Sequence, residues 1–360
     1  MKVNVSIYGL STEGYYLASI LSSNGANVSI IDELKMMAIN VPPSITMSYP
    51  NVETLIEEDT LLKLEHQAKT IQNADYIFFA PKIRKIGQEA KDEMTNKFKN
   101  AIMNINKDTS LIFNLPLGFG MNQEFIEILE RFTGSEINYH YMPLGLYSSL
   151  IGSNKVDERL LKLLNNVDNK LQVLDVESAE IVYISKILSH YLSLISSFEA
   201  YKNSNQIIEI EEARELYIDD IASGLFDLRM ISLSMQSSTP LAYLINGSIK
   251  SVENYTKYLI DKIKKIIRRL ELRSNNIKIY LIWSMDKYEM RGDRIFMSEI
   301  LKSKIEENIT EVKREYINRL DDKIPLVISC SRYDYNNLKE KGVNDAINIK
   351  ANPFCEMLKD

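Results

Sequence analysis

The chain has 360 residues, and its 43 Lys and Arg against 49 Asp and Glu give a net charge of −6. With 45% hydrophobic and 26% charged residues, the composition is typical of a soluble globular protein and excludes general disorder. The length predicts two or three domains, each large enough to bury its own core. The acidic balance argues against a general nucleic-acid binder, because phosphate contacts require an excess of Lys and Arg.

Membrane spans, disulfides and structural metals are not expected. The longest uninterrupted apolar runs, such as Tyr76–Pro81 and Ile279–Trp283, are far shorter than the roughly 18 residues that cross a bilayer. The N-terminus lacks the apolar stretch and cleavage site of a signal peptide, so we expect a cytoplasmic protein with no membrane partner. Two cysteines, Cys330 and Cys355, are too few for a disulfide framework, and no Cys/His cluster has metal-ligand spacing.

The first part of the chain predicts a βαβ unit. Lys2–Tyr8 and Ala26–Ile31 are apolar runs typical of strands, Gly9–Gly14 predicts a turn, and Tyr15–Asn24 has a helical period. The same alternation continues with a helix at 55–73, a strand at 75–80, a helix at 90–105, a strand at 110–114 and a helix at 123–132. Helices interleaved with short buried strands predict an α/β fold, with a Rossmann-like doubly wound parallel sheet over residues 1–150.

A helical region follows this sheet. From about Glu177 to Asn203 the apolar period indicates one long helix, and helical character continues to about Leu272. Residues 151–275 are therefore expected to form an α-helical middle domain with a long central helix. The polar stretch Arg273–Asn276 is the best linker candidate.

The last part of the chain returns to the α/β pattern. Ile277–Trp283 and Pro325–Cys330 read as strands, and Met297–Asn308 reads as a helix. Residues 276–360 are therefore expected to form a second, smaller Rossmann-like α/β domain.

The turn after the first strand resembles a dinucleotide-binding motif. A dinucleotide fold has Gly-x-Gly-x-x-Gly between its first strand and helix. Here the motif runs from Gly9 to Gly14, and Ser11 replaces the second glycine. The Ser11 side chain is expected to project toward the pyrophosphate, and Glu13 adds a negative charge to a helix N-terminus that favours anions.

An acidic residue is present where NAD-binding folds hold the adenosine ribose. Asp32 ends the second strand, which is the position of that acid. Gly9, Ser11, Gly14 and Asp32 are therefore candidate cofactor-binding residues. The alternative stays open that the glycines serve only the turn geometry and that Asp32 only caps the strand.

Segments along nearly the whole chain carry a family resemblance. They are residues 3–32, 75–81, 114–118, 178–180, 238–241, 255–267, 282–301 and 326–335, and they include the motifs Asn114-Leu115-Pro116-Leu117-Gly118 and Ser178-Ala179-Glu180. In their order and spacing they resemble the UDP-glucose/GDP-mannose dehydrogenase family, whose members oxidise a nucleotide-sugar alcohol to an acid with two NAD. The resemblance implies two Rossmann-like domains joined by a helical, dimer-forming middle. It adds Ala80 and Pro81 to the cofactor-binding candidates and makes Arg294 a substrate-binding candidate.

The catalytic positions of that family are not matched. The resemblance implies a cysteine that attacks the aldehyde as a thiolate, and this position is Ser223 here, with Asp227 retained and Phe226 at the loop lysine. Ser223 and Asp227 are therefore the candidate catalytic residues. The remaining family positions carry neutral residues, namely Asn114, Leu144, Tyr183 and Ile187.

Three functional hypotheses follow. The first is a degenerate nucleotide-sugar dehydrogenase homologue, a non-catalytic dinucleotide or nucleotide-sugar binding or scaffold protein that forms a homodimer through the middle-domain helix. The second is a divergent NAD-dependent oxidoreductase acting on a CH-OH group of a nucleotide sugar, with Asp227 or His190 as the base. The third is a protein-interaction module that uses the basic stretch at 257–269, for which a solvated helix face is the alternative interpretation.

Overall fold

The computed structural model describes residues 2–57, 63–145, 150–155, 157–164, 171–203, 217–235, 238–314, 323–341 and 346–352. Cys355 lies outside these ranges. The chain divides into two compact units. The first comprises Met1–Leu188, Phe226–Thr239 and Asp286–Gly292, and the second comprises Ser189–Leu225, Pro240–Met285 and Asp293–Asp360.

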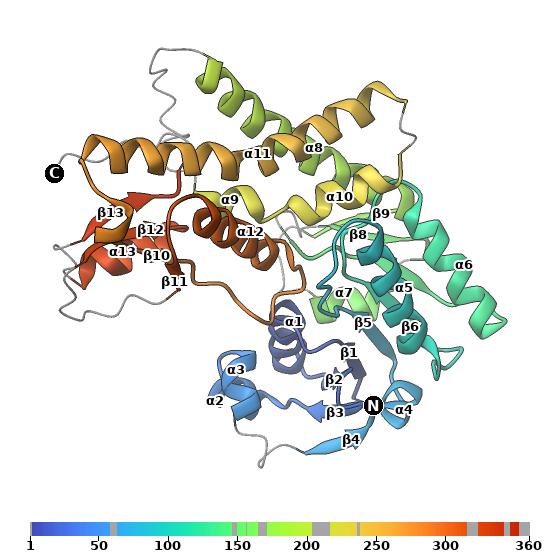
Figure 1. The fold of residues 1–360 in the computed structure, drawn as a ribbon. Coiled ribbons are helices and arrows are strands. Elements are labelled where there is room, and N and C mark those ends of the chain that lie inside the picture. Colours follow the sequence, from blue (N-terminus) through green and yellow to red (C-terminus); the bar gives the residue numbers. More distant parts are fainter. Residues whose placement is uncertain are drawn as a thin grey trace. The chain divides into compact units, whose positions relative to one another are not determined.

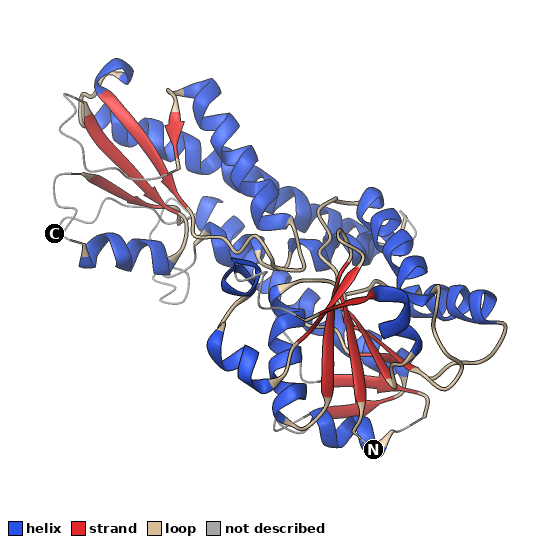
Figure 2. Cartoon of the chain, turned by 90° about the horizontal axis from the view of Figure 1, so that it is seen from below, coloured by secondary structure: helices blue, strands red, loops and turns tan. Residues whose placement is uncertain are grey.

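The first unit is built on a large, mostly parallel sheet (Figures 1 and 2). Among the described residues its strand order is β4-β3-β2-β1-β5-β6-β7-β8-β9. The strands are β1 (Asn4–Tyr8), β2 (Asn27–Asp32), β3 (Met37–Asn40), β4 (Leu64–His66), β5 (Tyr76–Phe79), β6 (Ser110–Phe113), β7 (Tyr139–Tyr141), β8 (Leu150–Ser153) and β9 (Gln172–Leu174). In the part of the sheet that the structure describes, β3 pairs antiparallel with β2 and β4, β8 pairs antiparallel with β7, and the other pairs are parallel. The doubly wound Rossmann-like sheet predicted from the sequence is confirmed.

Helices cover both faces of this sheet (Figure 2). They are α1 (Thr12–Ser23), α2 (Pro43–Ser48), α3 (Val52–Glu57), α4 (Gln67–Gln72), α5 (Gln88–Ile102), α6 (Met121–Thr133) and α7 (Glu158–Leu164). On the face under α5 and α6, a ring cluster joins Phe98 and Phe125 to Phe113, with centroids 4.6 Å apart for Phe113 and Phe125 and 5.0 Å apart for Phe98 and Phe125. Each of these buried side chains contributes about 1.5–3 kcal/mol through removal of apolar surface from water.

The sheet has its topological switch point between β1 and β5, where the chain stops adding strands on one side of β1 and continues on the other. β1 pairs in parallel with β2 on one side and with β5 on the other. In open α/β sheets, ligands bind outside the carboxyl ends of the strands at this switch point. The loops after Tyr8 and Phe79 therefore frame the first candidate site.

The second unit combines long helices with a smaller parallel sheet. Its sheet has the order β11-β10-β12-β13 in the described residues, with β10 (Ile277–Ile282), β11 (Val312–Lys313), β12 (Ile324–Ser329) and β13 (Ile347–Lys350). Its helical elements are α9 (Ile218–Ala222), α11 (Pro240–Arg269), η3 (Ser274–Asn276), α12 (Asp293–Asn308) and α13 (Arg332–Glu340). α8 (Val176–Asn203) contributes to both units, whereas α10 (Leu225–Leu233) belongs almost wholly to the first. In the second unit, Phe198 of α8 packs edge-on against Tyr255 of α11, with 5.5 Å between centroids.

The smaller C-terminal sheet and the long central helix also agree with the sequence-based prediction. α8 spans Val176–Asn203, nearly the predicted range, because its apolar residues recur with a helical period. The three-part domain division expected from the sequence stays a prediction.

Two sequence-based assignments are wrong in detail. The predicted helix at 55–73 contains β4, whose three residues pair with β3, and the described residues on either side of it include the short helices α3 and α4. Residues 151–174, expected to begin the helical middle domain, instead lie in the first unit, where they form most of β8, together with α7 and β9. In both places sheet pairing with residues distant in sequence decides the structure, and a local apolar period does not report such pairing.

α8 also has the length and apolar composition of a membrane span over Val176–Ala200. Within the first unit, however, it carries the buried Glu180, whose carboxylate accepts hydrogen bonds from Gly120 N at 2.5 Å and from Asn122 Nδ2 at 2.7 Å. Further along, Tyr191 is fully buried in the second unit. About 39% of this stretch is buried inside the protein, Glu180 and Tyr191 included, and a single helix of such length and composition is weak evidence for a membrane span.

Candidate functional site

The turn after β1 brings two backbone segments into close contact. Gly9 has φ 117°, and a Cβ there would lie 2.3 Å from Pro81 Cα. Ala80 and Pro81 follow β5 and are both buried, and Ala80 N donates to Tyr8 O at 2.9 Å. Only glycine is tolerated at position 9 because of both the positive φ and the approach of Pro81. This requirement accounts for Gly9 without any bound cofactor.

Ser11 points into the protein. It is 0% exposed, and its Oγ donates to Ala80 O at 2.6 Å and accepts from Gly14 N at 3.1 Å. It is the N-cap of α1, and serine is a preferred cap because its hydroxyl satisfies an amide of the first turn. The expectation that this side chain projects toward the pyrophosphate is therefore wrong. The hydroxyl can be buried because Ala80 O accepts its proton and the Gly14 amide donates to it.

Two acidic residues, Asp32 and Glu33, lie near the expected ribose position, and the carboxylate of each already has partners within the chain. Asp32 ends β2 as predicted, and its Oδ1 accepts from the amides of Leu34 at 3.0 Å and Lys35 at 3.4 Å. The next residue, Glu33, is only 8% exposed in its side chain and forms an ion pair with Lys97 of α5 at 3.1 Å. An ion pair of the chain itself thus bridges from the end of β2 to α5.

Amides of the glycine turn also have acceptors within the chain. Leu10 N donates to Glu33 Oε2 at 3.4 Å, and Thr12 N donates to Tyr288 O at 2.8 Å. In a dinucleotide complex, amides of this turn and of the first turn of the helix bind the pyrophosphate. The cofactor that the fold implies therefore does not fit here without displacing these contacts.

The second candidate position, Asp227 on α10, is part of a buried polar cluster in the first unit. Its residue exposure is 1%, and Arg291 Nε lies 3.0 Å from its Oδ1. The Tyr183 hydroxyl of α8 donates to Oδ2 at 2.7 Å. The Arg291 guanidinium also donates to Leu144 O. Oδ2 of Asp227 thus accepts a hydrogen bond, whereas Oδ1 is engaged by Arg291 only through an ion pair without an aligned hydrogen bond.

Burial and charge compensation act in opposite directions on the pKa values of this cluster. Burial raises the pKa of Asp227 above its ordinary value, while Arg291 and the Tyr183 hydroxyl oppose the rise. Burial alone would lower the pKa of Arg291, but the Asp227 carboxylate raises it above the ordinary value for arginine. Arg291 therefore remains charged at all physiological pH values and neutralises Asp227.

Arg291 was not singled out in the sequence. A carboxylate buried as deeply as that of Asp227 needs a compensating cation. The sequence could not identify which of its arginines supplies that charge, because Arg291 lies far from Asp227 along the chain.

The other candidate catalytic residue, Ser223, is the C-cap of α9 in the second unit. Its hydroxyl donates to Asp220 O at 2.9 Å, which is a local helix-end contact. His190, the alternative base, is half-buried on α8 and lies edge-on to Tyr191 at 5.4 Å. Burial lowers the pKa of His190, and Asp220 opposes this shift.

Arg294, the substrate-binding candidate, lies in the second unit beside Asp219. Its Nε is 3.3 Å from Asp219 Oδ1, and Trp283 Nε1 donates to the same oxygen at 2.7 Å. The start of α9 meets the carboxyl ends of this sheet, since Asp219 N donates to Cys330 O at 3.2 Å. Burial raises the pKa of Asp219, and Arg294 opposes the rise. The charge of Arg294 is thus already matched within the unit.

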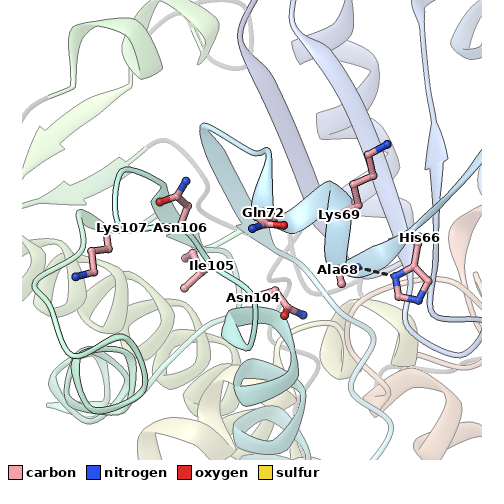
Figure 3. Close-up of a pocket in the computed structure, with 8 residues that line it drawn as sticks. All are labelled: His66, Ala68, Lys69, Gln72, Asn104, Ile105, Asn106 and Lys107. Carbon is pink, nitrogen blue, oxygen red and sulfur yellow. Dashed lines mark hydrogen bonds between the residues drawn. The ribbon is translucent and has the colours of Figure 1, made fainter.

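A hollow of about 590 Å³ lies at the opposite end of the first sheet, beside the amino ends of β5 and β6. It is lined by His66, Ala68, Lys69, Gln72, Asn104, Ile105, Asn106 and Lys107 (Figure 3). The amino groups of Lys69 and Lys107 point in opposite directions, away from Gln72 and Asn104 between them (Figure 3). Polar groups do not converge in this hollow, so it is a weaker candidate than the switch point. In the described ranges, no group of three or more His, Cys, Asp or Glu could hold a metal ion.

Comparison with known proteins supports the fold. The chain matches UDP-D-ManNAc dehydrogenase from Pyrococcus horikoshii with a TM-score of 0.67 at 12% identity, covering 99% of this chain and 96% of that one. It matches UDP-N-acetyl-mannosamine dehydrogenase from Staphylococcus aureus with a TM-score of 0.60 at 14% identity, covering 91% and 88%. The match to a UDP-glucose dehydrogenase from Pyrobaculum islandicum has a TM-score of 0.56 at 13% identity and covers 97% of this chain and 86% of that one.

The structural neighbours are thus UDP-sugar dehydrogenases, and the resemblance inferred from the sequence is confirmed at the level of the fold. No family model matches the sequence. No curated protein matches it either.

Proposed function

We propose that this chain keeps the fold of a nucleotide-sugar dehydrogenase and lacks its oxidation chemistry, acting as a non-catalytic binding or scaffold protein. The observation that carries the proposal is the buried cluster of Asp227, Arg291 and Tyr183. The one acidic residue retained from the family's catalytic loop is neutralised within the protein.

This cluster is unsuited to proton transfer. A general base must come within hydrogen-bond reach of the substrate proton, and Asp227 is 1% exposed with both carboxylate oxygens engaged. Tyr183 cannot replace a lysine cation, because a phenol has no cationic form. Burial also raises its pKa well above the ordinary value and so keeps it neutral. The cluster is closed off inside the first unit and its charges are compensated there, so its role in the proposal is to hold the fold together.

The nucleophile is also missing. Attack on an aldehyde needs a thiolate or a hydroxyl activated by a base. The Ser223 hydroxyl donates its proton to Asp220 O, a backbone carbonyl that is no base. A thioester route to an acid is therefore excluded by the chemistry of this residue.

The alternative is a divergent NAD-dependent oxidoreductase acting on a CH-OH group of a nucleotide sugar. Such a two-electron oxidation needs no thiolate, but it needs a base and a bound NAD. His190 is the remaining candidate base, and its lowered pKa keeps it neutral and able to accept a proton at neutral pH.

A homodimer in the cytoplasm is part of the proposal. In the second unit, Tyr243 and Leu244 of α11 are 68% and 54% exposed, and Leu192 and Ile195 of α8 are half-buried. A second copy of the chain would remove these apolar side chains from water. Light scattering of the purified protein tests for the dimer. The variant Leu244→Glu is expected to shift the monomer–dimer equilibrium toward the monomer.

The decisive experiment is an assay of NADH formation with UDP-glucose and with UDP-N-acetyl-mannosamine. We expect no turnover in the wild-type protein. NADH formation that is lost in Ser223→Ala, and retained in the matched serine variant Ser303→Ala on α12, would refute the proposal. Turnover lost in His190→Phe and kept in Ser223→Ala would favour the divergent oxidoreductase.

A further inference from the structure

We infer that residues 286–292, here called the strap, occupy the anion-binding position at the N-terminus of α1 and close the first unit to dinucleotides. The strap belongs to the first unit together with the glycine turn and β5. The inference goes beyond the loss of catalysis, because it concerns whether the cofactor position is open at all.

The strap binds the two donors of Thr12, the first residue of α1. Tyr288 O accepts the Thr12 amide at 2.8 Å, and the Thr12 hydroxyl donates to Asp286. Glu13 Oε2 accepts the Met290 amide at 2.8 Å. A pyrophosphate at this helix N-terminus would need the same amide that Tyr288 now uses.

The strap is equally bound to the chain that follows β5. Ile83 N donates to Met290 O at 2.7 Å, and Arg84 Nη2 donates to Lys287 O at 2.7 Å. Gly292 permits this approach, because a Cβ there would lie 3.0 Å from Ile83 O. Both sides of the switch point, β1 and β5, are thus joined by the same segment.

The charges around the turn also oppose a pyrophosphate. Carboxylates of Glu13, Glu33 and Asp286 all lie at the turn or at the first turn of α1. Lys97 is shared between Glu33 and Glu93 at 3.1 and 3.3 Å, and the amino group of Lys82 lies over the ring of the strap residue Tyr288, 5.0 Å from its centroid. A bound dinucleotide would bring further negative charge to a place where carboxylates already satisfy the helix dipole.

The end of the strap is anchored by the buried ion pair. Arg291 follows Met290 directly and is held by Asp227 at 3.0 Å. Lifting the strap therefore pulls on a buried charge pair as well as on the hydrogen bonds at α1. Because NAD can bind only to the fraction of molecules with the strap displaced, its apparent affinity falls by that fraction.

Two measurements on the full chain test the inference. The first is hydrogen exchange of the Thr12 amide in the ligand-free protein, resolved to single residues by mass spectrometry. The second is calorimetric titration with NAD. Both compare the wild type with the double variant Glu13→Ala/Asp286→Ala, which removes two strap contacts. Glu89→Ala, in the first turn of α5, is the matched control.

In the wild type we expect slow exchange at Thr12 and no NAD binding below millimolar concentration. In the double variant we expect exchange about tenfold faster and at least about tenfold tighter NAD binding, whereas Glu89→Ala changes neither. Fast exchange at Thr12 in the wild type, or no gain of NAD affinity in the double variant, overturns the inference. NAD binding gained without NADH formation would leave the loss of catalysis intact, so the two proposals fail separately.

Discussion

Replacing Arg291 by methionine should destabilise the first unit in a pH-dependent way. Methionine keeps most of the side-chain volume but leaves Asp227 buried beside the Tyr183 hydroxyl without a cation. Removing one partner of a buried ion pair costs about 3–5 kcal/mol, because the other charge stays out of water.

The structure sets a limit to this loss. In the variant, Asp227 can escape its unpaired charge by taking up a proton, and burial already raises its pKa. In the unfolded chain an aspartate has a pKa of about 3.9. Keeping Asp227 protonated in the folded variant therefore costs about 4 kcal/mol at pH 7 and about 1.5 kcal/mol at pH 5. Since the folded-state pKa lies above the unfolded one, the penalty grows as pH rises.

Urea unfolding followed by circular dichroism at pH 5 and pH 7 measures this difference. Arg131→Met is the matched control, because Arg131 pairs with Glu127 at 3.1 Å while its side chain is 75% exposed, and such surface pairs contribute about 0–1 kcal/mol. The double variant Arg291→Met/Asp227→Asn should recover much of the loss. Equal losses at both pH values, or no recovery in the double variant, would refute the assignment of a buried ion pair.

Three further predictions concern the first unit. His140 is 1% exposed and burial lowers its pKa to about 4, so about 3 kcal/mol of stability should be lost as pH falls from about 6.5 to about 4, and urea unfolding of His140→Phe should lack this loss. Glu180→Gln should lower the free energy of unfolding by about 1.5–3 kcal/mol in thermal melts, because its carboxylate accepts the Gly120 amide at the start of α6. Gly9→Ala should reduce soluble yield and Tm strongly, because a Cβ meets Pro81 Cα at 2.3 Å, and an unchanged melt would contradict this geometry.

Local patterns were enough to predict most of the architecture. β1, α1 and β2 appear in order because an apolar run, a glycine turn and a helical period follow one another over a few residues. α8 was predicted almost to the residue for the same reason. The strands β3, β4, β7, β8 and β9 of the first sheet were missed, because pairing with residues distant in sequence decides them and a short local pattern does not report such pairing.

The candidate site was predicted only in part. Asp32 ends β2 as expected, because its place follows from the strand pattern alone. The direction of the Ser11 side chain was not predictable, because it depends on Ala80 O, which follows a different strand.

What the sequence by itself determined is the series of strands, turns and helices and the absence of a thiolate at Ser223, because both follow from residue types and their spacing. Only the tertiary structure decided that Arg291 neutralises Asp227 and that Tyr288 takes the Thr12 amide. These partners are separated by long stretches of chain, and burial in one unit brings them together. The physical reason is that a buried charge or amide must find a partner wherever the fold provides one, and local sequence patterns carry no record of which distant residue that will be.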